Sequence, residues 1–349
     1  AYRCAATKAD VDAYKVQHGA GRGFRGNDEG AGAVRLRVPD DGESVVHDII
    51  RGDATFAHEH LDDPVIARAD GSVLYNFAVA VDDMDAAITH VVRGEDHLSN
   101  TARQLLVLEA LGAQPPVYAH LPLLHGADGK KLSKRHGAAS VQEFRDMGYL
   151  PEALNNYLAL LGWGAEDDET ILSRDELTER FSLERVSRNP ARFDHQKLRW
   201  MNGRYMRALT LDDLTARLQS YTGRTGLRDA VAISQEKMQT LAEFEPLAAF
   251  IFDGPADDPK AREKWLGADG RAVLADVHAA LQPLDEFTLH TVQAALEGVV
   301  AARDAKPGKV FQPVRVALAG SAVSPGIFET LTVLGRAQSL ARIENALRP

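Results

Sequence analysis

Cysteine is almost absent from this sequence, and its scarcity excludes several kinds of protein. A single residue, Cys4, among 349 cannot build an intramolecular disulfide framework or a cysteine-rich zinc site. No apolar run approaches the roughly 18 residues that suggest a membrane helix. The first residues also lack the basic and then apolar pattern of a signal peptide. These absences predict a cytoplasmic protein with no bound zinc and no membrane partner.

A net positive charge is absent too, because the formal charge is -10 at pH 7. Taken alone, this value argues against a nucleic-acid partner, but phosphate binding needs only a local basic surface. Seven Lys or Arg residues against one acid, Asp194, lie between Arg185 and Arg207, and the segment after Ala301 is also basic. Such runs are either solvated surface or a phosphate-contacting face, and composition does not decide between them.

The first part of the chain has the pattern of a mixed α/β region. Residues 19–32 are rich in glycine and predict a loop. The alternation of apolar and polar residues in 34–38 predicts a strand. Residues 73–81 are rich in β-branched and aromatic types, so a further strand is expected, with Tyr75, Phe77 and Val79 on one face.

A short apolar run at 88–92 is followed by the polar residues 93–97. A helix is then expected to start near residues 99–101, whose hydroxyls would cap it, and to stop at Gly112. This order of strand, polar turn and helix is typical of a parallel α/β sheet, in which ligands bind beyond the carboxyl ends of the strands. After Pro151 the pattern is almost wholly helical and predicts a bundle.

The most distinctive motif is a basic loop after a glycine-rich turn. Gly126-Ala127-Asp128-Gly129 precedes the run Lys-Lys-Leu-Ser-Lys-Arg at positions 130–135. A mobile loop with these charges can close over a triphosphate and neutralise charge that develops as pyrophosphate departs. A solvated surface loop would have the same composition, but the specific order beyond an α/β sheet favours the phosphate role.

This loop resembles the second signature of class I aminoacyl-tRNA synthetases, commonly written Lys-Met-Ser-Lys-Ser. The segments 61–63, 75–77, 88–97, 148–154 and 312–317 are similar to bacterial glutamyl-tRNA synthetases, and the resemblance spans essentially the whole chain. It implies an α/β, partial Rossmann-type class I synthetase catalytic core with an α/β insertion, followed by an all-α helical anticodon-binding region. The helical ending differs from glutaminyl-tRNA synthetases, whose anticodon region resembles β-barrels.

The resemblance also implies four regions. They are a partial acceptor-stem-binding insertion in 1–72, the second half of the nucleotide-binding catalytic domain in 73–120, the lysine-signature loop and stem-contact region in 121–205, and a helical anticodon-binding domain in 206–349.

Site residues follow from the same resemblance. Glutamate would be bound by Tyr75, Val79 and Arg93, and a guanidinium fork suits a carboxylate. Without the resemblance, Arg93 could equally be a structural partner of Glu95 or Asp96. The residues at the tRNA acceptor end would be Asp96 and His97. ATP would be bound by Lys131, Leu132, Ser133, Lys134, Arg135 and Glu95, with Lys134 and Lys131 as catalytic residues. The tRNA backbone would contact Arg185, Arg188, Arg192, Lys197, Arg199 and Arg204.

The implied activity is ATP-dependent attachment of glutamate to its tRNA through a glutamyl-adenylate. The expected partners are tRNA(Glu), L-glutamate and ATP with Mg²⁺ as a substrate complex, and the expected state is a monomer. No enzyme nucleophile is required, because the glutamate carboxylate attacks the α-phosphorus and the protein supplies position and charge.

The first signature of the family, a His-Ile-Gly-His-type segment, has no match in this sequence, since His58-Glu59-His60 follows no suitable strand. Either the natural protein carries that segment ahead of Ala1, or this is a shortened relative that binds tRNA without catalysis. We favour the first explanation, because the lysine loop and Arg93 would otherwise have little purpose. A tRNA-modifying relative would lack the long helical region, so residues 206–349 count against it.

Overall fold

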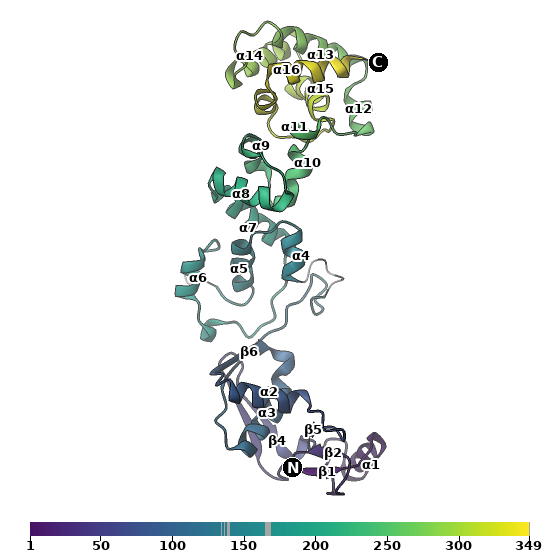
Figure 1. Ribbon diagram of the computed structural model, residues 1–349, viewed down its shortest axis with the longest axis vertical. Coiled ribbons are helices and arrows are strands. Elements are labelled where there is room, and N and C mark those ends of the chain that lie inside the picture. Colours follow the sequence, from purple (N-terminus) through teal and green to yellow (C-terminus); the bar gives the residue numbers. More distant parts are fainter. Residues whose placement is uncertain (134, 136, 138–139, 165–168, 349) are drawn as a thin grey trace. The chain divides into compact units, whose positions relative to one another are not determined.

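The computed structural model describes all residues except 134, 136, 138–139, 165–168 and 349. The chain divides into two compact units, the first formed by Ala1–His136 and Leu158–Phe193 and the second by Gly137–Tyr157 and Asp194–Pro349. Figure 1 labels the helices and strands and colours them along the sequence. Each unit has its own hydrophobic core. None of the helices in the described part is both long enough and apolar enough to cross a bilayer.

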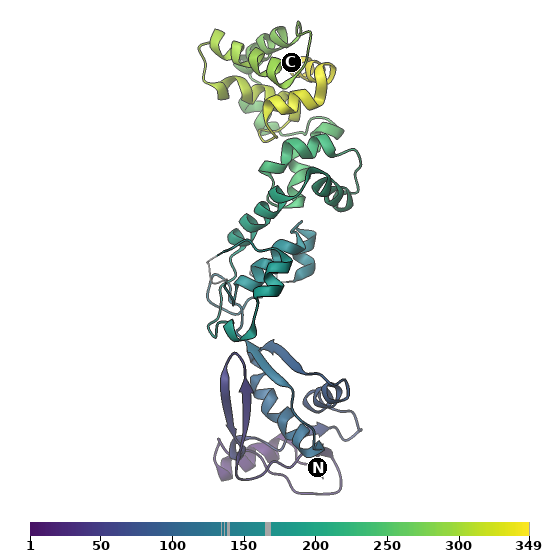
Figure 2. The same ribbon diagram turned by 90° about the vertical axis from the view of Figure 1, so that its left-hand side faces the viewer.

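Two sheets organise the first unit. The smaller sheet is antiparallel with the order β1-β2-β5, and the larger sheet has the order β4-β3-β7-β6. In the larger sheet β3 and β4 form an antiparallel hairpin (Figure 2), whereas β6 and β7 are parallel. The strands are β1 (Tyr2–Cys4), β2 (Ala33–Arg35), β3 (Glu43–Asp48), β4 (Gly52–Ala57), β5 (Val65–Ala67), β6 (His90–Gly94) and β7 (Val117–Leu121). The predicted parallel α/β arrangement is confirmed by β6 and β7 and the helix between them.

The helices of the first unit are α1 (Lys8–His18), α2 (Tyr75–Asp85), α3 (Leu98–Leu111) and α6 (Arg174–Arg180). The prediction of a strand over 73–81 is wrong, because this segment forms α2. In a helix, Phe77 and Ala80 lie at i and i+3 and pack together against Val107 and Leu108 of α3. Burial on this face outweighs the β propensity of the segment. Tyr75 and Phe77 therefore do not share a face, and Tyr75 remains 53% exposed.

Two other local predictions need correction. α3 begins at Leu98 after His97, and no side chain caps it, so the expected hydroxyl caps at 99–101 are not used in this way. Its predicted end is confirmed, since Gly112 adopts a left-handed conformation at φ 68°. The strand expected over 34–38 is shorter: pairing with β5 is irregular at Arg35, and the amide of Val38 donates instead to Asp63 at 2.8 Å.

The second unit is helical, as the sequence predicts. Its helices build two buried clusters, one around Phe244 and Leu214 and the other around Leu274 and Val314. One of its helices ends at residue 222, where Gly223 adopts a left-handed conformation. The helices are α4 (Val141–Asp146), α5 (Pro151–Leu160, which continues into the first unit), α7 (His195–Ala208), α8 (Leu211–Thr222), α9 (Arg228–Ser234), α10 (Phe244–Ala248), α11 (Phe250–Asp253), α12 (Pro259–Trp265), α13 (Ala268–Leu281), α14 (Leu289–Ala302), α15 (Pro307–Ala319) and α16 (Ile327–Leu347).

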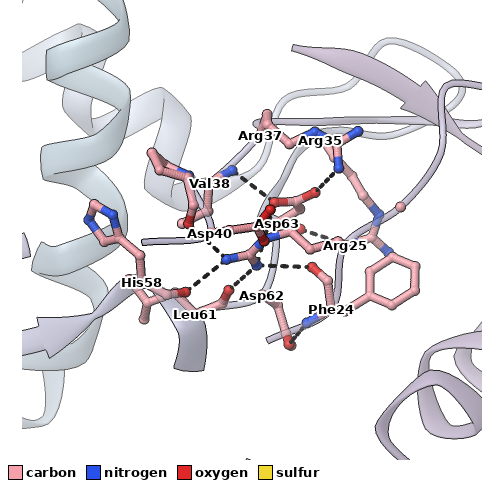
Figure 3. A network of polar contacts seen from close by, with 12 residues as sticks. Phe24, Arg25, Arg35, Arg37, Val38, Asp40, His58, Leu61, Asp62 and Asp63 are labelled. Atoms are coloured by element: carbon pink, nitrogen blue, oxygen red, sulfur yellow. Dashed lines mark hydrogen bonds and ion pairs between the residues drawn. The ribbon is translucent and has the colours of Figure 1, made fainter. Parts of the chain in front are cut away.

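A polar hub holds the smaller sheet to the loops around it (Figure 3). The Asp63 side chain is fully buried and accepts hydrogen bonds from the phenol of Tyr2, the guanidinium of Arg37 and the amide of Val38. Burial, with a contribution from Asp63, raises the pKa of Tyr2 to about 12, so the phenol keeps its proton and donates. Arg25 lies 3.7 Å from the same carboxylate and donates to four backbone carbonyl groups, those of Phe24, Leu61, His58 and Pro39.

Removal of the Asp63 carboxylate should therefore destabilise the first unit strongly. We expect Asp63→Ala to lower its free energy of unfolding by about 3–5 kcal/mol, because buried donors lose their common acceptor. Asp40 pairs with the same Arg25 from a position that is 68% exposed, so Asp40→Ala should cost less than about 1 kcal/mol. Urea unfolding followed by circular dichroism measures both, and equal costs would contradict this account.

Candidate functional site

The candidate site lies where β6 and β7 end, at the edge of the larger sheet. The strand register pairs Arg93 on β6 with His120 on β7. A single turn of 3₁₀ helix, η2 (Glu95–His97), follows β6 and leads into α3. Residues 93–97 thus begin at the carboxyl end of a parallel strand, where open α/β sheets bind their ligands.

Arg93 is half-buried and is held by neutral side chains. Its Nε donates to Nε2 of His120 at 3.2 Å. Its Nη2 donates to Oγ1 of Thr101 and to Oε1 of Gln104, both at 2.7 Å. Three contacts from β7 and α3 therefore fix the plane of the guanidinium without neutralising its charge.

The two acids that follow Arg93 have other partners. Glu95 forms an ion pair with Arg51, and Asp96 forms one with Lys131 at 2.9 Å. Neither acid pairs with Arg93. The alternative in which Arg93 is a structural partner of Glu95 or Asp96 is therefore wrong. In the described part of the chain, no ion pair joins Arg93 to an acid.

Behind Arg93 lies a buried pair, Asp48 at the end of β3 and His120 on β7. Both side chains are fully buried, and Nδ1 of His120 lies 2.6 Å from Oδ2 of Asp48. The other oxygen, Oδ1, accepts the amide hydrogens of Ile50, Arg51 and His120. A carboxylate only accepts, so the proton of the imidazole is on Nδ1 and Nε2 is free to accept from Arg93.

The electrostatics of this pair favour a carboxylate beside a neutral imidazole. Burial alone would raise the pKa of Asp48, but the amides of Arg51, His120 and Ile50 and the imidazole together hold it below its usual value. Burial lowers the pKa of His120, assisted by the charges of Arg93 and His97, and this outweighs the opposing effect of Asp48. His120 is therefore neutral at physiological pH.

The glutamate-binding residues predicted on 73–81 come from α2. The ring centroid of Tyr75 lies 6.0 Å from that of His97, and Val79 follows one helical turn after Tyr75. Oδ1 of Asn76 accepts a hydrogen bond of 3.2 Å from Gln104, which is itself an acceptor for the guanidinium. The start of α2, the end of β6 and the start of α3 thus meet at one corner.

The basic loop begins as a tight turn closed by hydrogen bonds. Gly129 donates to the carbonyl of Gly126 at 3.0 Å, and Leu132 donates to the carbonyl of Leu124 at 2.7 Å. The hydrogen bond from Lys131, with its charge, lowers the pKa of Asp96. Of the predicted ATP-binding residues, Lys134 lies outside the described residues, and those the structure does describe are Lys131, Leu132, Ser133, Arg135 and Glu95.

Within the described ranges, no group of three or more His, Cys, Asp or Glu side chains is arranged to hold a metal ion. The absence of zinc remains a prediction from the single cysteine. Magnesium that arrives with a nucleotide needs no cage of protein ligands, because it usually keeps several waters and binds phosphate oxygens.

Two family models match the chain. One describes the catalytic domain of class I tRNA synthetases (E and Q) and matches residues 19–200, and the other describes an anticodon-binding domain and matches residues 213–347. The chain belongs to the class I tRNA synthetases of the E and Q type. The resemblance predicted from the lysine loop is confirmed, and so is the predicted fold class.

Similar proteins agree with this family. Glutamate–tRNA ligase 1 of Acidithiobacillus ferrooxidans is 42% identical over 99% of this chain and 79% of its own length. Glutamate–tRNA ligase 2 of Brucella ovis is 44% identical over 89% of this chain and 69% of its own length. A solved glutamate tRNA ligase from Elizabethkingia meningosepticum, in complex with its amino acid, is 26% identical with a TM-score of 0.80 over 99% of this chain and 78% of that chain.

The synthetase's predicted tRNA-contacting residues divide between the two units. In the first, Arg185 stacks on Trp163 at 5.4 Å and donates to the carbonyl of Gly164, and the backbone carbonyl of Arg188 accepts from Arg51 at 2.9 Å. The backbone of Arg192 bridges to His125.

In the second unit, α7 carries the other three predicted tRNA-contacting residues, Lys197, Arg199 and Arg204. Arg199 is paired with Glu243 at 2.6 Å. The side chains of Lys197 and Arg204 are exposed, and no ion pair or hydrogen bond joins either one to another described residue.

Sequence reasoning missed the residues that hold Arg93 in place. Thr101 was noted only as a possible helix cap, and the contact between Asp48 and His120 joins positions 72 apart. The one local signal was polarity: His120 stands in the otherwise apolar strand 117–121, and Asp48 directly precedes the apolar pair Ile49-Ile50. A buried polar side chain needs a partner, but the sequence does not say which partner it has.

The neutral state of His120 predicts a pH dependence of stability. Its folded pKa lies below the ordinary 6.5, so the unfolded chain binds a proton first as the pH falls. The stability that neutral His120 contributes is complete above about pH 6.5 and is lost as the pH falls toward the folded pKa. The free energy of unfolding of the first unit should therefore fall from about pH 7.5 to about pH 5.5 more steeply than in His120→Gln, which cannot titrate. Urea unfolding at the two pH values gives the slopes, and parallel slopes would rule out this effect.

Proposed function

We propose that the protein attaches glutamate to tRNA(Glu) in an ATP-dependent reaction through a glutamyl-adenylate. The observation that carries this proposal is Arg93, a guanidinium with an unneutralised charge at the carboxyl end of a parallel strand, beside the base of the lysine loop. The class I synthetase family and the glutamate–tRNA ligase names of the similar proteins support the same reaction.

Arg93 and Tyr75 would bind glutamate. A buried or half-buried guanidinium forms strong charge-assisted hydrogen bonds with a carboxylate, and a nearby phenol adds a donor. Val79, one turn along α2, would line the same pocket. The bound glutamate then needs no enzyme nucleophile, because its own carboxylate oxygen attacks the α-phosphorus of ATP and pyrophosphate leaves.

The lysine loop would bind the phosphates. Lys131, with Leu132, Ser133, Lys134 and Arg135, would stabilise the negative charge that grows on the departing pyrophosphate, and Mg²⁺ would enter with ATP as part of the substrate. Lys131 is paired with Asp96, so binding of phosphate would exchange one anionic partner for another. Glu95, Asp96 and His97 would lie toward the ribose and the tRNA acceptor end, where a tRNA hydroxyl displaces AMP.

The remaining regions would bind tRNA. We assign residues 1–72 to the acceptor-stem-binding insertion, 73–120 to the catalytic core, 121–205 to the stem-contact region and 206–349 to the anticodon-binding domain. The matches over 19–200 and 213–347 support a boundary between the third and the fourth of these regions. As in the family generally, we expect the enzyme to act as a monomer in the cytoplasm.

The direct test is glutamate- and tRNA-dependent exchange of pyrophosphate into ATP by the natural gene product that contains this sequence. We expect exchange with glutamate and tRNA(Glu) and none with tRNA omitted. If tRNA binds but no exchange occurs, the protein is a non-catalytic tRNA-binding relative and the proposed function fails.

Arg93→Ala should raise the KM for glutamate by about 100-fold and leave the KM for ATP within about twofold, because a charge-assisted contact to one substrate is lost. Arg103→Ala is the matched control, since among the described residues this arginine of α3 donates only to the carbonyl of Ser99 in its own helix. The control should keep the wild-type KM values. Equal effects on glutamate and ATP in Arg93→Ala would remove this arginine from the glutamate pocket.

The exposed cations of α7 predict a salt-dependent contribution to tRNA binding. Substituting both Lys197→Ala and Arg204→Ala should weaken tRNA(Glu) binding and reduce the slope of log K against log salt concentration by about 1.5, as expected for two lost phosphate contacts. Arg199→Ala should change the slope less, because Glu243 already neutralises this arginine. Filter binding over a salt series measures the slopes, and an unchanged slope in the double variant would exclude this face.

A further inference from the structure

The hydrogen bonds of Arg93 leave one part of its guanidinium free. Nε is committed to His120, and both hydrogens of Nη2 have acceptors in Thr101 and Gln104. No hydrogen bond joins Nη1 to another residue that the structure describes. A ligand carboxylate would therefore meet Arg93 through Nη1, whose direction is set by the contacts of the other two nitrogens.

The contact from Nε depends on the tautomer of His120. Nε2 can accept only while it carries no hydrogen, which requires the proton on Nδ1. Asp48, 2.6 Å from Nδ1, keeps the proton there. With a hydrogen on Nε2 instead, two donors would face each other across 3.2 Å.

We propose that His120, oriented by Asp48, is a positioning residue for glutamate binding: its Nε2 accepts from Nε of Arg93 and thereby directs Nη1 toward the substrate carboxylate. This inference rests on the proposed function, since it assigns to Arg93 the glutamate carboxylate as its ligand. His120 does not contact the substrate. It acts through the orientation of the guanidinium.

A purely structural role makes a different prediction. The Asp48–His120 pair joins β3 to β7, and any residue that keeps the bond to Asp48 would then suffice. Substitution of His120 by each of the two amide residues, asparagine and glutamine, separates these roles. In His120→Asn the side-chain amide can replace Nδ1 as the donor to Asp48 but offers nothing at the position of Nε2. In His120→Gln the side-chain oxygen can replace Nε2 as the acceptor from Arg93, while the contact to Asp48 is lost.

We therefore compare the two variants in the natural gene product by pyrophosphate exchange and by calorimetric titration with glutamate. His120→Asn should raise the KM and the Kd for glutamate by about tenfold, the value of the lost hydrogen bond to the charged Arg93. The contact of Nε2 with Oγ1 of Thr101, at 3.1 Å, is lost in the same variant. His120→Gln should restore both constants to within about threefold of wild type. The KM for ATP should stay constant in both. His47→Asn is the matched control, because His47 on the same strand as Asp48 pairs with Asp53 in an exposed position.

A second variant keeps the test independent of whether His120→Asn folds. Asp48→Asn preserves volume but presents an amide to Nδ1, which favours the proton on Nε2 and places it against Arg93. It should also raise the glutamate KM by about tenfold.

The outcomes are distinct. The positioning role is overturned if His120→Gln is impaired while His120→Asn is not, if both amides have the same effect, or if Asp48→Asn leaves the glutamate KM unchanged. If wild type shows no glutamate-dependent exchange and no binding, the proposed function itself fails and this inference fails with it.

Discussion

The buried hydrogen bond between Asp48 and His120 is the contact on which the site depends. It joins the hairpin strand β3 to the parallel strand β7, and it fixes the imidazole so that β6 can attach to it through Arg93. The same aspartate also closes the turn after β3 by accepting two amides there. One carboxylate thus connects the turn that carries Arg51, the strand that carries His120 and, indirectly, the guanidinium of Arg93. Since both partners are fully buried, water cannot substitute for either of them.

Sequence patterns predicted the larger architecture because helical periodicity and glycine stops are local properties. The helical second half, the end of α3 at Gly112 and the parallel arrangement around residues 93–97 all follow from short segments. The segment 73–81 was mispredicted because its β-branched and aromatic residues suit a strand, whereas its helical form buries Phe77 and Ala80 against α3. Which form is more stable depends on a partner surface that lies some 30 positions further along the chain.

Parts of the site were predictable to different degrees. Arg93, Tyr75 and the lysine loop stand in recognisable motifs, so resemblance alone suggested them, and their roles remain proposals. Asp48, Gln104 and Asn76 belong to no motif, and their importance comes from contacts between distant segments. The hub at Asp63 is a similar case, because its partners also come from distant segments. There a buried carboxylate, surrounded by arginines and the phenol of Tyr2, holds a small sheet together without a disulfide.

The fixed orientation of the Arg93 guanidinium also bears on the choice between glutamate and its amide, glutamine. A guanidinium has five N–H donors and no acceptor in any orientation, and the hydrogen bonds of Nε and Nη2 leave the donors of Nη1 for a ligand. A carboxylate has acceptor oxygens in every orientation, but a carboxamide that turns its nitrogen inward meets donor against donor. A carboxamide that turns its oxygen inward can still accept from Nη1, but it carries no negative charge. If Arg93 binds the side-chain carboxylate, it would therefore favour glutamate over glutamine through charge, without a change in the size of the pocket.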